Sequence, residues 1–114
     1  MKAMPPSAPY LGEFEHLILL AVLQCGDEAD TVSIRQTLID RSGRPVARGA
    51  LFTSLDRLET KGLVRSRLGP PLAVRGGRPR RHYAVSAAGV QALRAARAVV
   101  AQLSQGLESV LGRR

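Results

Sequence analysis

The sequence is poor in residues on which several classes of protein depend. Cys25 is its only cysteine, so no disulfide can form within the 114 residues. One cysteine and two histidines are too few for a structural zinc site. No phosphate-binding loop, no Ser/His/Asp order and no paired carboxylates with a partner base stand out. We therefore expect no enzyme activity, no metal and no cofactor.

Long apolar runs are also missing. The longest, residues 17–23, is about a third of the roughly 20 residues that a membrane-spanning helix needs. The first residues lack the basic-then-apolar pattern of a secretory signal. We therefore expect a cytoplasmic location. With 45% hydrophobic residues, the chain can bury the core of one domain.

Acidic residues are absent from a long stretch of the chain. There is no Asp or Glu from Lys61 to Leu107, where the basic residues gather, and the whole chain has a net charge of +8. Lys2 and Lys61 are the only lysines among the 17 basic residues, so the others are arginines. The planar guanidinium fits phosphate and guanine edges. This charge pattern indicates a nucleic-acid partner.

Two helices are expected in the first part of the chain. Residues 11–25 are apolar nearly all round, so this helix needs cover on two sides. Ser33 and Gln36 form a capping box that predicts a second helix reaching about residue 42. Residues 31–32, just before it, are expected in a very short strand.

A third helix is expected over 47–61. Leu51, Leu55 and Leu58 recur on one face of it. Its first residues are poor caps, so its N-terminal amides are available to water or to a phosphate oxygen.

The period of the sequence then changes from helical to extended. Residues 63–68 and 80–85 are predicted to form strands, joined by a loop rich in Gly, Pro and Arg. A basic hairpin of this kind is typical of a wing. Ser86 is expected to cap a last helix that reaches about residue 111.

The last helix carries an apolar seam spaced 3-4-3-4-3, similar to a coiled coil. As one helix it would be about 39 Å long, although Gly106 weakens its last turns. The seam predicts a homodimer in which this helix packs against the first helix of the partner. The expected seam residues are Leu19, Leu20, Leu23, Leu93, Val100, Leu103 and Leu107.

The expected fold class is mostly α with a small β-hairpin. It is a winged helix-turn-helix with a long C-terminal dimerisation helix. We divide the chain into a flexible N-terminal arm (1–10), a DNA-binding domain (11–85) and the dimerisation helix (86–114). The third helix would enter the major groove of double-stranded DNA, with the wing along a neighbouring minor groove or the backbone.

Three segments resemble the PadR family of bacterial transcriptional regulators. They are residues 49–63 (GALFTSLDRLETKGL), residues 76–89 (GGRPRRHYAVSAAG) and residues 11–20 (LGEFEHLILL). The resemblance covers about residues 11–98 and extends to the short subfamily with a single C-terminal helix. It implies a homodimeric repressor that binds an inverted-repeat operator.

The sequence departs from the family pattern in three respects. Phe52 stands where the family commonly has Tyr, and Asp30-Thr31 replaces an aromatic–Gly pair. The absence of Trp argues against the tryptophan-sandwich drug pocket of some relatives. Any pocket at the dimer seam should be small and aliphatic, so we expect either a small apolar effector or none.

The candidate DNA-binding residues come from the third helix and the wing. On the helix they are Gly49, Thr53 and Arg57, which face away from the leucines, and Arg48 at its start. In the wing they are Arg75, Arg78, Arg80 and Arg81, in a segment similar to the Gly-Arg-Pro core of minor-groove AT-hooks. For Arg57 the alternative is an ion pair with Asp56 or Glu59 on its own surface.

Two functions from different classes fit this reading. The first is a sequence-specific transcriptional regulator associated with the nucleoid. The second is a winged-helix interaction module whose basic wing binds an acidic protein or RNA. The outward face of the third helix lacks the large apolar anchors of a protein-docking helix, which favours the regulator.

Overall fold

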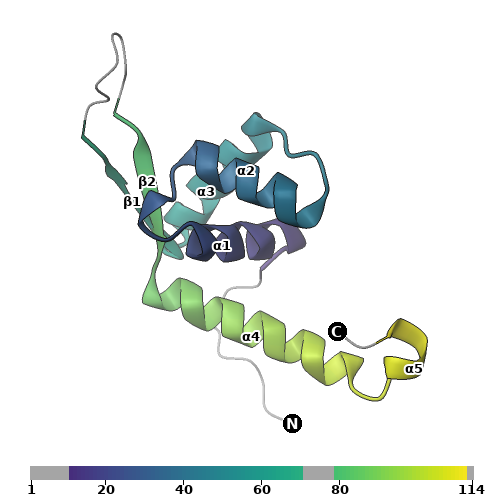
Figure 1. Ribbon diagram of the computed structural model, residues 1–114. Coiled ribbons are helices and arrows are strands. Elements are labelled where there is room, and N and C mark those ends of the chain that lie inside the picture. The colour runs from purple at the N-terminus through teal and green to yellow at the C-terminus, as the bar shows by residue number, and fades with distance from the viewer. Residues whose placement is uncertain (1–10, 71–78, 113–114) are drawn as a thin grey trace.

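The computed structural model describes residues 11–70 and 79–112 (Figure 1). The N-terminal arm expected over 1–10 lies outside the described residues. The elements follow in the order α1 (Glu13–Cys25), a 3-10 turn (Gly26–Glu28), α2 (Thr31–Ser42), α3 (Arg48–Thr60), β1 (Val64–Leu68), β2 (Arg81–Val85), α4 (Ala87–Ser104) and α5 (Glu108–Leu111). The expected class, mostly α with one hairpin, is confirmed. In the described part of the chain, no helix combines the length and apolarity needed to cross a bilayer.

Helix α1 is the centre of the fold. It packs against α2, α3, β2 and α4, which is why it is apolar on so much of its surface. The leucines expected on the inner face of α3 are all buried, as are Ile34 and Leu38 of α2. The helical periodicity therefore identified the inner face of α3 correctly.

The start of α2 differs from the expectation. The helix begins at Thr31, and its cap is Asp30, whose side chain accepts a hydrogen bond from the backbone N–H of Ser33 at 2.8 Å. The capping box at Ser33 and the strand at 31–32 are therefore wrong. Asp is as good a cap as Ser, and Asp30 already has the extended backbone that a cap needs, with φ −88° and ψ 171°.

The two strands form an antiparallel hairpin in which Val64 pairs with Val85 and Leu68 with Arg81. The chain just before α2 adds to its edge, because the N–H of Tyr83 donates to the carbonyl of Ala29 at 2.9 Å. A further bridge joins Asp30 to His82. The base of the wing is thus held to the helix-turn-helix by backbone hydrogen bonds.

Helix α4 begins where the sequence predicts. The hydroxyl of Ser86 accepts from the N–H of Gly89 at 3.0 Å and donates to the carbonyl of Gly62 at 2.6 Å. The helix ends at Ser104 rather than near residue 111, so the single helix of the expectation is wrong. Gln105 leaves the helical conformation, with φ −59° and ψ 128°. Gly106 follows with φ +86°, which favours glycine, and the chain turns into the short α5 (Figure 1).

Two residues of the expected dimer seam lie in the core of the single chain. Leu19 and Leu93 are 0% and 4% exposed within one subunit. They therefore leave little surface for a second copy to contact. Leu20 is half-buried, and Leu23, Val100, Leu103 and Leu107 are exposed.

Candidate nucleic-acid interface

The turn between α2 and α3 sets where α3 begins. Gly43 ends α2 in the left-handed conformation, with φ +70°, and its N–H donates to the carbonyl of Ile39. The Nε of Arg35 donates to the carbonyl of Val46 at 2.7 Å, and the Val46 side chain is buried. Both ends of the turn are therefore fixed to α2.

The N-terminus of α3 is exposed and has no side-chain cap. Ala47 occupies the cap position without a side-chain hydrogen bond, as the sequence predicts. Arg48 and Gly49 follow it on the surface, and beyond the adjoining residues and backbone of α3 no atom lies within 4 Å of the place where a Cβ of Gly49 would be. The amides of the first turn are thus open to an anion.

The outward face of α3 carries Thr53 and Arg57, both exposed. Among the residues that the structure describes, no carboxylate oxygen lies within 4.0 Å of the guanidinium of Arg48 or Arg57. The alternative ion pair of Arg57 with Asp56 or Glu59 is therefore absent. Arg48, Gly49, Thr53 and Arg57 are all exposed on α3.

Phe52 of α3 is an exposed aromatic side chain that the sequence analysis did not include among the candidate DNA contacts. Phe52 is 50% exposed and lines a surface groove between α3 and the base of the hairpin, together with Val32, Asp56 and Arg81. A rotation of 100° per residue carries Phe52 away from the buried face of Leu51. That rotation was the signal that could have placed it on the surface.

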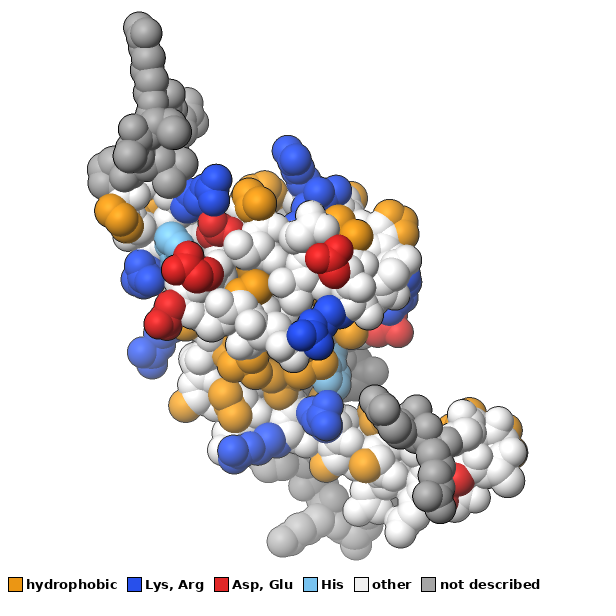
Figure 2. Space-filling view, viewed as in Figure 1, with side chains coloured by type: hydrophobic (Ala, Val, Ile, Leu, Met, Phe, Trp, Pro, Cys, Tyr) orange, Lys and Arg blue, Asp and Glu red, His pale blue; other side chains and the backbone are white. Residues whose placement is uncertain are grey.

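The arginines of the wing have different surroundings. Arg80 places Nη1 3.0 Å from Oδ2 of the buried Asp30, whereas Nη1 of Arg81 donates to the hydroxyl of Ser66 at 3.0 Å. That hydroxyl in turn donates to Glu59 of α3 at 2.6 Å. Figure 2 shows this mixture of basic and acidic side chains on the upper part of the molecule, near the hairpin. Arg75 and Arg78 lie outside the described residues.

The pKa of the Asp30 carboxyl is below its ordinary value. Burial raises this pKa, but the N–H and hydroxyl of Ser33 and the guanidinium of Arg80 outweigh burial. The carboxylate is therefore charged at neutral pH, and Arg80 is its counter-charge.

Lys61 belongs to the structure and not to the interface. Its Nζ lies 2.8 Å from Oε2 of the buried Glu15, whose other oxygen accepts from the N–H of Gly12. Burial raises the pKa of Glu15, but Lys61 and the Gly12 amide bring it below its ordinary value. The contact joins the end of α3 to the start of α1.

Two further polar side chains lie in or near the core. Tyr83 is buried, as expected, and burial raises the pKa of its hydroxyl. Cys25 Sγ lies 3.4 Å from the hydroxyl of Thr37. Within residues 11–70 and 79–112, no group of three or more His, Cys, Asp or Glu side chains could hold a metal ion.

Comparison with known proteins agrees with this geometry. The model of the PadR-like family of transcriptional regulators matches residues 19–95, which is more than half of the chain. That span includes α2, α3 and the hairpin. Among proteins of curated function, none matches this chain.

Several solved structures have the same fold. A PadR family regulator from Eggerthella lenta is 27% identical with a TM-score of 0.66, and the match covers 90% of this chain and 88% of that one. One from Clostridium difficile is 20% identical with a TM-score of 0.69, covering 87% and 99%. One from Bacillus cereus is 19% identical with a TM-score of 0.68, covering 89% and 93%.

An exposed, uncapped α3 beside an arginine-bearing hairpin is the arrangement by which winged helix-turn-helix proteins hold DNA. The family match extends over these same elements. The chain belongs to the PadR-like family of transcriptional regulators, which act by binding DNA and not as enzymes.

Proposed function

We propose that this protein is a repressor that binds an inverted-repeat operator in double-stranded DNA as a homodimer. The observation that carries the proposal is the exposed part of α3. The amides at its N-terminus are uncapped, and Arg48, Thr53 and Arg57 are exposed, with no carboxylate oxygen of the described residues within 4.0 Å of either guanidinium. This surface combines groups that hold phosphate with groups that read base edges.

Each residue of this surface has a chemical role in the proposal. Arg48 and the first amides of α3 hold a phosphate. Thr53 exchanges a hydrogen bond with a base edge, and Arg57 reads guanine or holds a second phosphate. Phe52, half-exposed beside them, contacts thymine methyl groups. Gly49 lets the helix approach the groove closely.

The homodimer rests on the apolar surface of α1 and α4. Leu23, Val99, Val100 and Leu103 are between 48% and 75% exposed in the single chain. A groove of 440 Å³ between the two helices continues this surface. Figure 2 shows hydrophobic side chains gathered where α1 faces α4. A second copy that packs here covers an apolar surface that water would otherwise meet.

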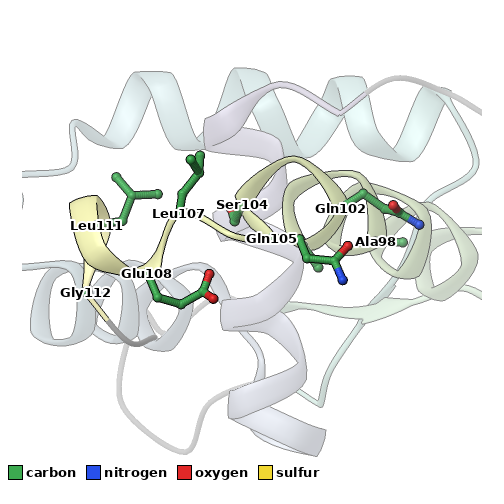
Figure 3. Close-up of a pocket in the computed structure, with 9 residues that line it drawn as sticks. Ala98, Gln102, Ser104, Gln105, Leu107, Glu108, Leu111 and Gly112 are labelled. Atoms are coloured by element: carbon green, nitrogen blue, oxygen red, sulfur yellow. The ribbon is translucent and has the colours of Figure 1, made fainter.

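The turn after α4 and the short helix α5 (Glu108–Leu111) extend the same surface. In Figure 3, Leu107 and Leu111 project to one side of the turn and Gln105 and Glu108 to the other. The two leucines are 44% and 64% exposed. We propose that they join the dimer contact, and that any effector bound at this seam is small and apolar.

The test compares variants on two DNA duplexes. One duplex is selected from a random pool by the wild-type protein, and the other has an unrelated sequence. Thr53→Ala should weaken binding to the selected duplex by about 1–3 kcal/mol, because a base contact is lost. It should leave binding to the unrelated duplex nearly unchanged.

Arg48→Gln is the matched control, because it removes a phosphate contact of the same helix. It should weaken binding to both duplexes and flatten the dependence of log Kd on log salt by about 0.9. Equal losses on both duplexes for Thr53→Ala would show that α3 does not read the sequence. Fluorescence anisotropy at several salt concentrations gives both quantities.

A further inference from the structure

Asp30 lies where α2 meets the base of the hairpin. Its Oδ1 accepts from the N–H of Ser33 at 2.8 Å, and its Oδ2 lies 3.0 Å from Nη1 of Arg80. Its backbone pairs with His82 in β2. The carboxylate thus joins the first turn of the helix-turn-helix to the strand that leaves the wing.

The burial of Asp30 makes it unfavourable for Arg80 to leave this ion pair for a DNA phosphate. The side chain of Asp30 is 8% exposed and that of Arg80 is 49% exposed. If Arg80 turned to a DNA phosphate, a buried carboxylate would remain without a counter-charge. Removing the counter-charge of a carboxylate that water barely reaches is unfavourable. Arg80 is therefore bound to Asp30 before DNA arrives.

Arg81 is a natural comparison, because it is the next residue and has the same side chain. Its Nη1 contacts the hydroxyl of Ser66, a neutral group, at 3.0 Å. In the described part of the chain, no carboxylate oxygen lies within 4.0 Å of its guanidinium. Its charge remains available to a phosphate.

We propose that Arg80 is a positioning residue that fixes the hairpin against α2 through Asp30, and that it does not contact DNA phosphate. This inference rests on the proposed function, in which α3 and the hairpin bind DNA together. It divides the basic residues of the wing by role. A charge count over the wing would treat Arg80 and Arg81 as equivalent.

The first experiment measures how binding to an unrelated DNA duplex depends on salt. Arg81→Gln should flatten the slope of log Kd against log salt by about 0.9, because one phosphate contact is lost. Arg80→Gln should leave the slope unchanged. Asp30→Asn keeps a cap for Ser33 but releases Arg80, so it should steepen the slope by about 0.9.

The second experiment needs no DNA. The N–H of Tyr83 donates to the carbonyl of Ala29, next to the ion pair. Its hydrogen exchange should become about tenfold faster in Arg80→Gln and in Asp30→Asn, because the hairpin opens more often. Arg80→Lys retains a charge partner and should restore slow exchange. Arg81→Gln should leave the exchange rate unchanged.

The outcomes separate this inference from the proposed function. A slope that flattens as much in Arg80→Gln as in Arg81→Gln would overturn the inference, as would unchanged exchange of Tyr83 in both Arg80→Gln and Asp30→Asn. If Arg48→Gln and Arg81→Gln both leave the slope unchanged, the proposed DNA interface is wrong. Faster exchange of Tyr83 in Arg80→Gln would then still support the positioning role.

Discussion

At the scale of single residues, the charged groups of this protein divide into those that bind each other and those that face solvent. Glu15 and Asp30 are buried carboxylates, and each has a basic partner from a distant part of the chain. These partners, Lys61 and Arg80, are part of the basic region that indicates DNA binding. Their charges hold elements together before any ligand is present.

The pair of Glu15 with Lys61 predicts a dependence of stability on pH. The carboxyl has an ordinary pKa of 4.5 and a lower one in the folded chain. Between the folded pKa and the ordinary pKa, the unfolded chain therefore binds more protons than the folded chain. The ionised Glu15 thus contributes its full stabilisation above pH 4.5, and this contribution is lost as the pH falls through the folded pKa. The pKa of Asp30 is likewise below its ordinary value of 3.8, so its contribution to stability is also lost as the pH falls through its folded pKa.

Glu15→Gln should remove the contribution of Glu15 to this dependence. At neutral pH it should also lower the free energy of unfolding by about 1–3 kcal/mol, because a charge-assisted hydrogen bond to Lys61 is lost. Urea unfolding between about pH 3 and pH 7, at one protein concentration, measures both effects.

Glu13→Gln is the control for this prediction. Glu13 lies on the same helix, and its contact with Arg44, at 3.4 Å, is on the surface. An exposed pair contributes little to stability, so this variant should follow the wild type. If Glu15→Gln also follows the wild type at every pH, the buried pair does not stabilise the fold.

At the scale of elements, the contact between α4 and the start of the hairpin depends on Gly89. A Cβ at this position would lie 2.2 Å from the carbonyl oxygen of Leu63 and 2.6 Å from Cγ1 of Val85. The first of these atoms belongs to the backbone and cannot turn aside. Helix α4 would have to move away from β1.

Gly89→Ala should therefore lower the free energy of unfolding by about 1–3 kcal/mol, the usual cost of overpacking. Gly49→Ala is the matched control, because open space surrounds that position on α3. It should keep or raise stability, since Ala favours helix. Urea unfolding of the two variants decides the point. A Gly89→Ala protein as stable as Gly49→Ala would contradict the packing described here.

At the scale of the whole molecule, the described residues form an elongated body, because α4 extends beyond the helix-turn-helix (Figure 1). The principal extents are 56 × 32 × 22 Å. Two copies joined through α1 and α4 would present two α3 helices to one DNA molecule. These helices must lie about 34–36 Å apart to enter successive major grooves.

The dimer predicts that a charge in the α4 seam separates the subunits. Leu103 is 75% exposed in the single chain, so Leu103→Asp should leave the subunit folded. In the dimer the carboxylate would be buried without a partner, which is strongly unfavourable. Sedimentation velocity should show a folded monomer at concentrations where the wild type is a dimer.

Gln91→Asp adds the same charge to an exposed position of α4 outside the seam. It should sediment as the wild type does. An unaltered monomer–dimer balance for Leu103→Asp would remove the seam from the interface. Apparent melting temperatures should be compared at equal protein concentration, because dimer stability depends on it.

The sequence determined by itself the fold class, the three helices and the hairpin of the DNA-binding domain, and the inner face of α3. Leu51, Leu55 and Leu58 are buried because helical spacing places these apolar side chains on one side of α3, and that side packs against the core. Ser86 caps α4, and Ala47 leaves α3 uncapped, because a cap is a local hydrogen bond between neighbouring residues. The exposed face of α3 follows from the same geometry.

Only the tertiary structure decided which partners distant residues have. Asp30 and Arg80 are 50 residues apart, and Glu15 and Lys61 are 46 apart, so no local pattern joins them. The burial of Leu19 and Leu93 depends on how the elements of one subunit pack on each other. A one-dimensional pattern gives the direction of a side chain relative to its own element. The neighbour that it meets depends on how the elements pack, because long-range contacts form only when the whole chain is folded.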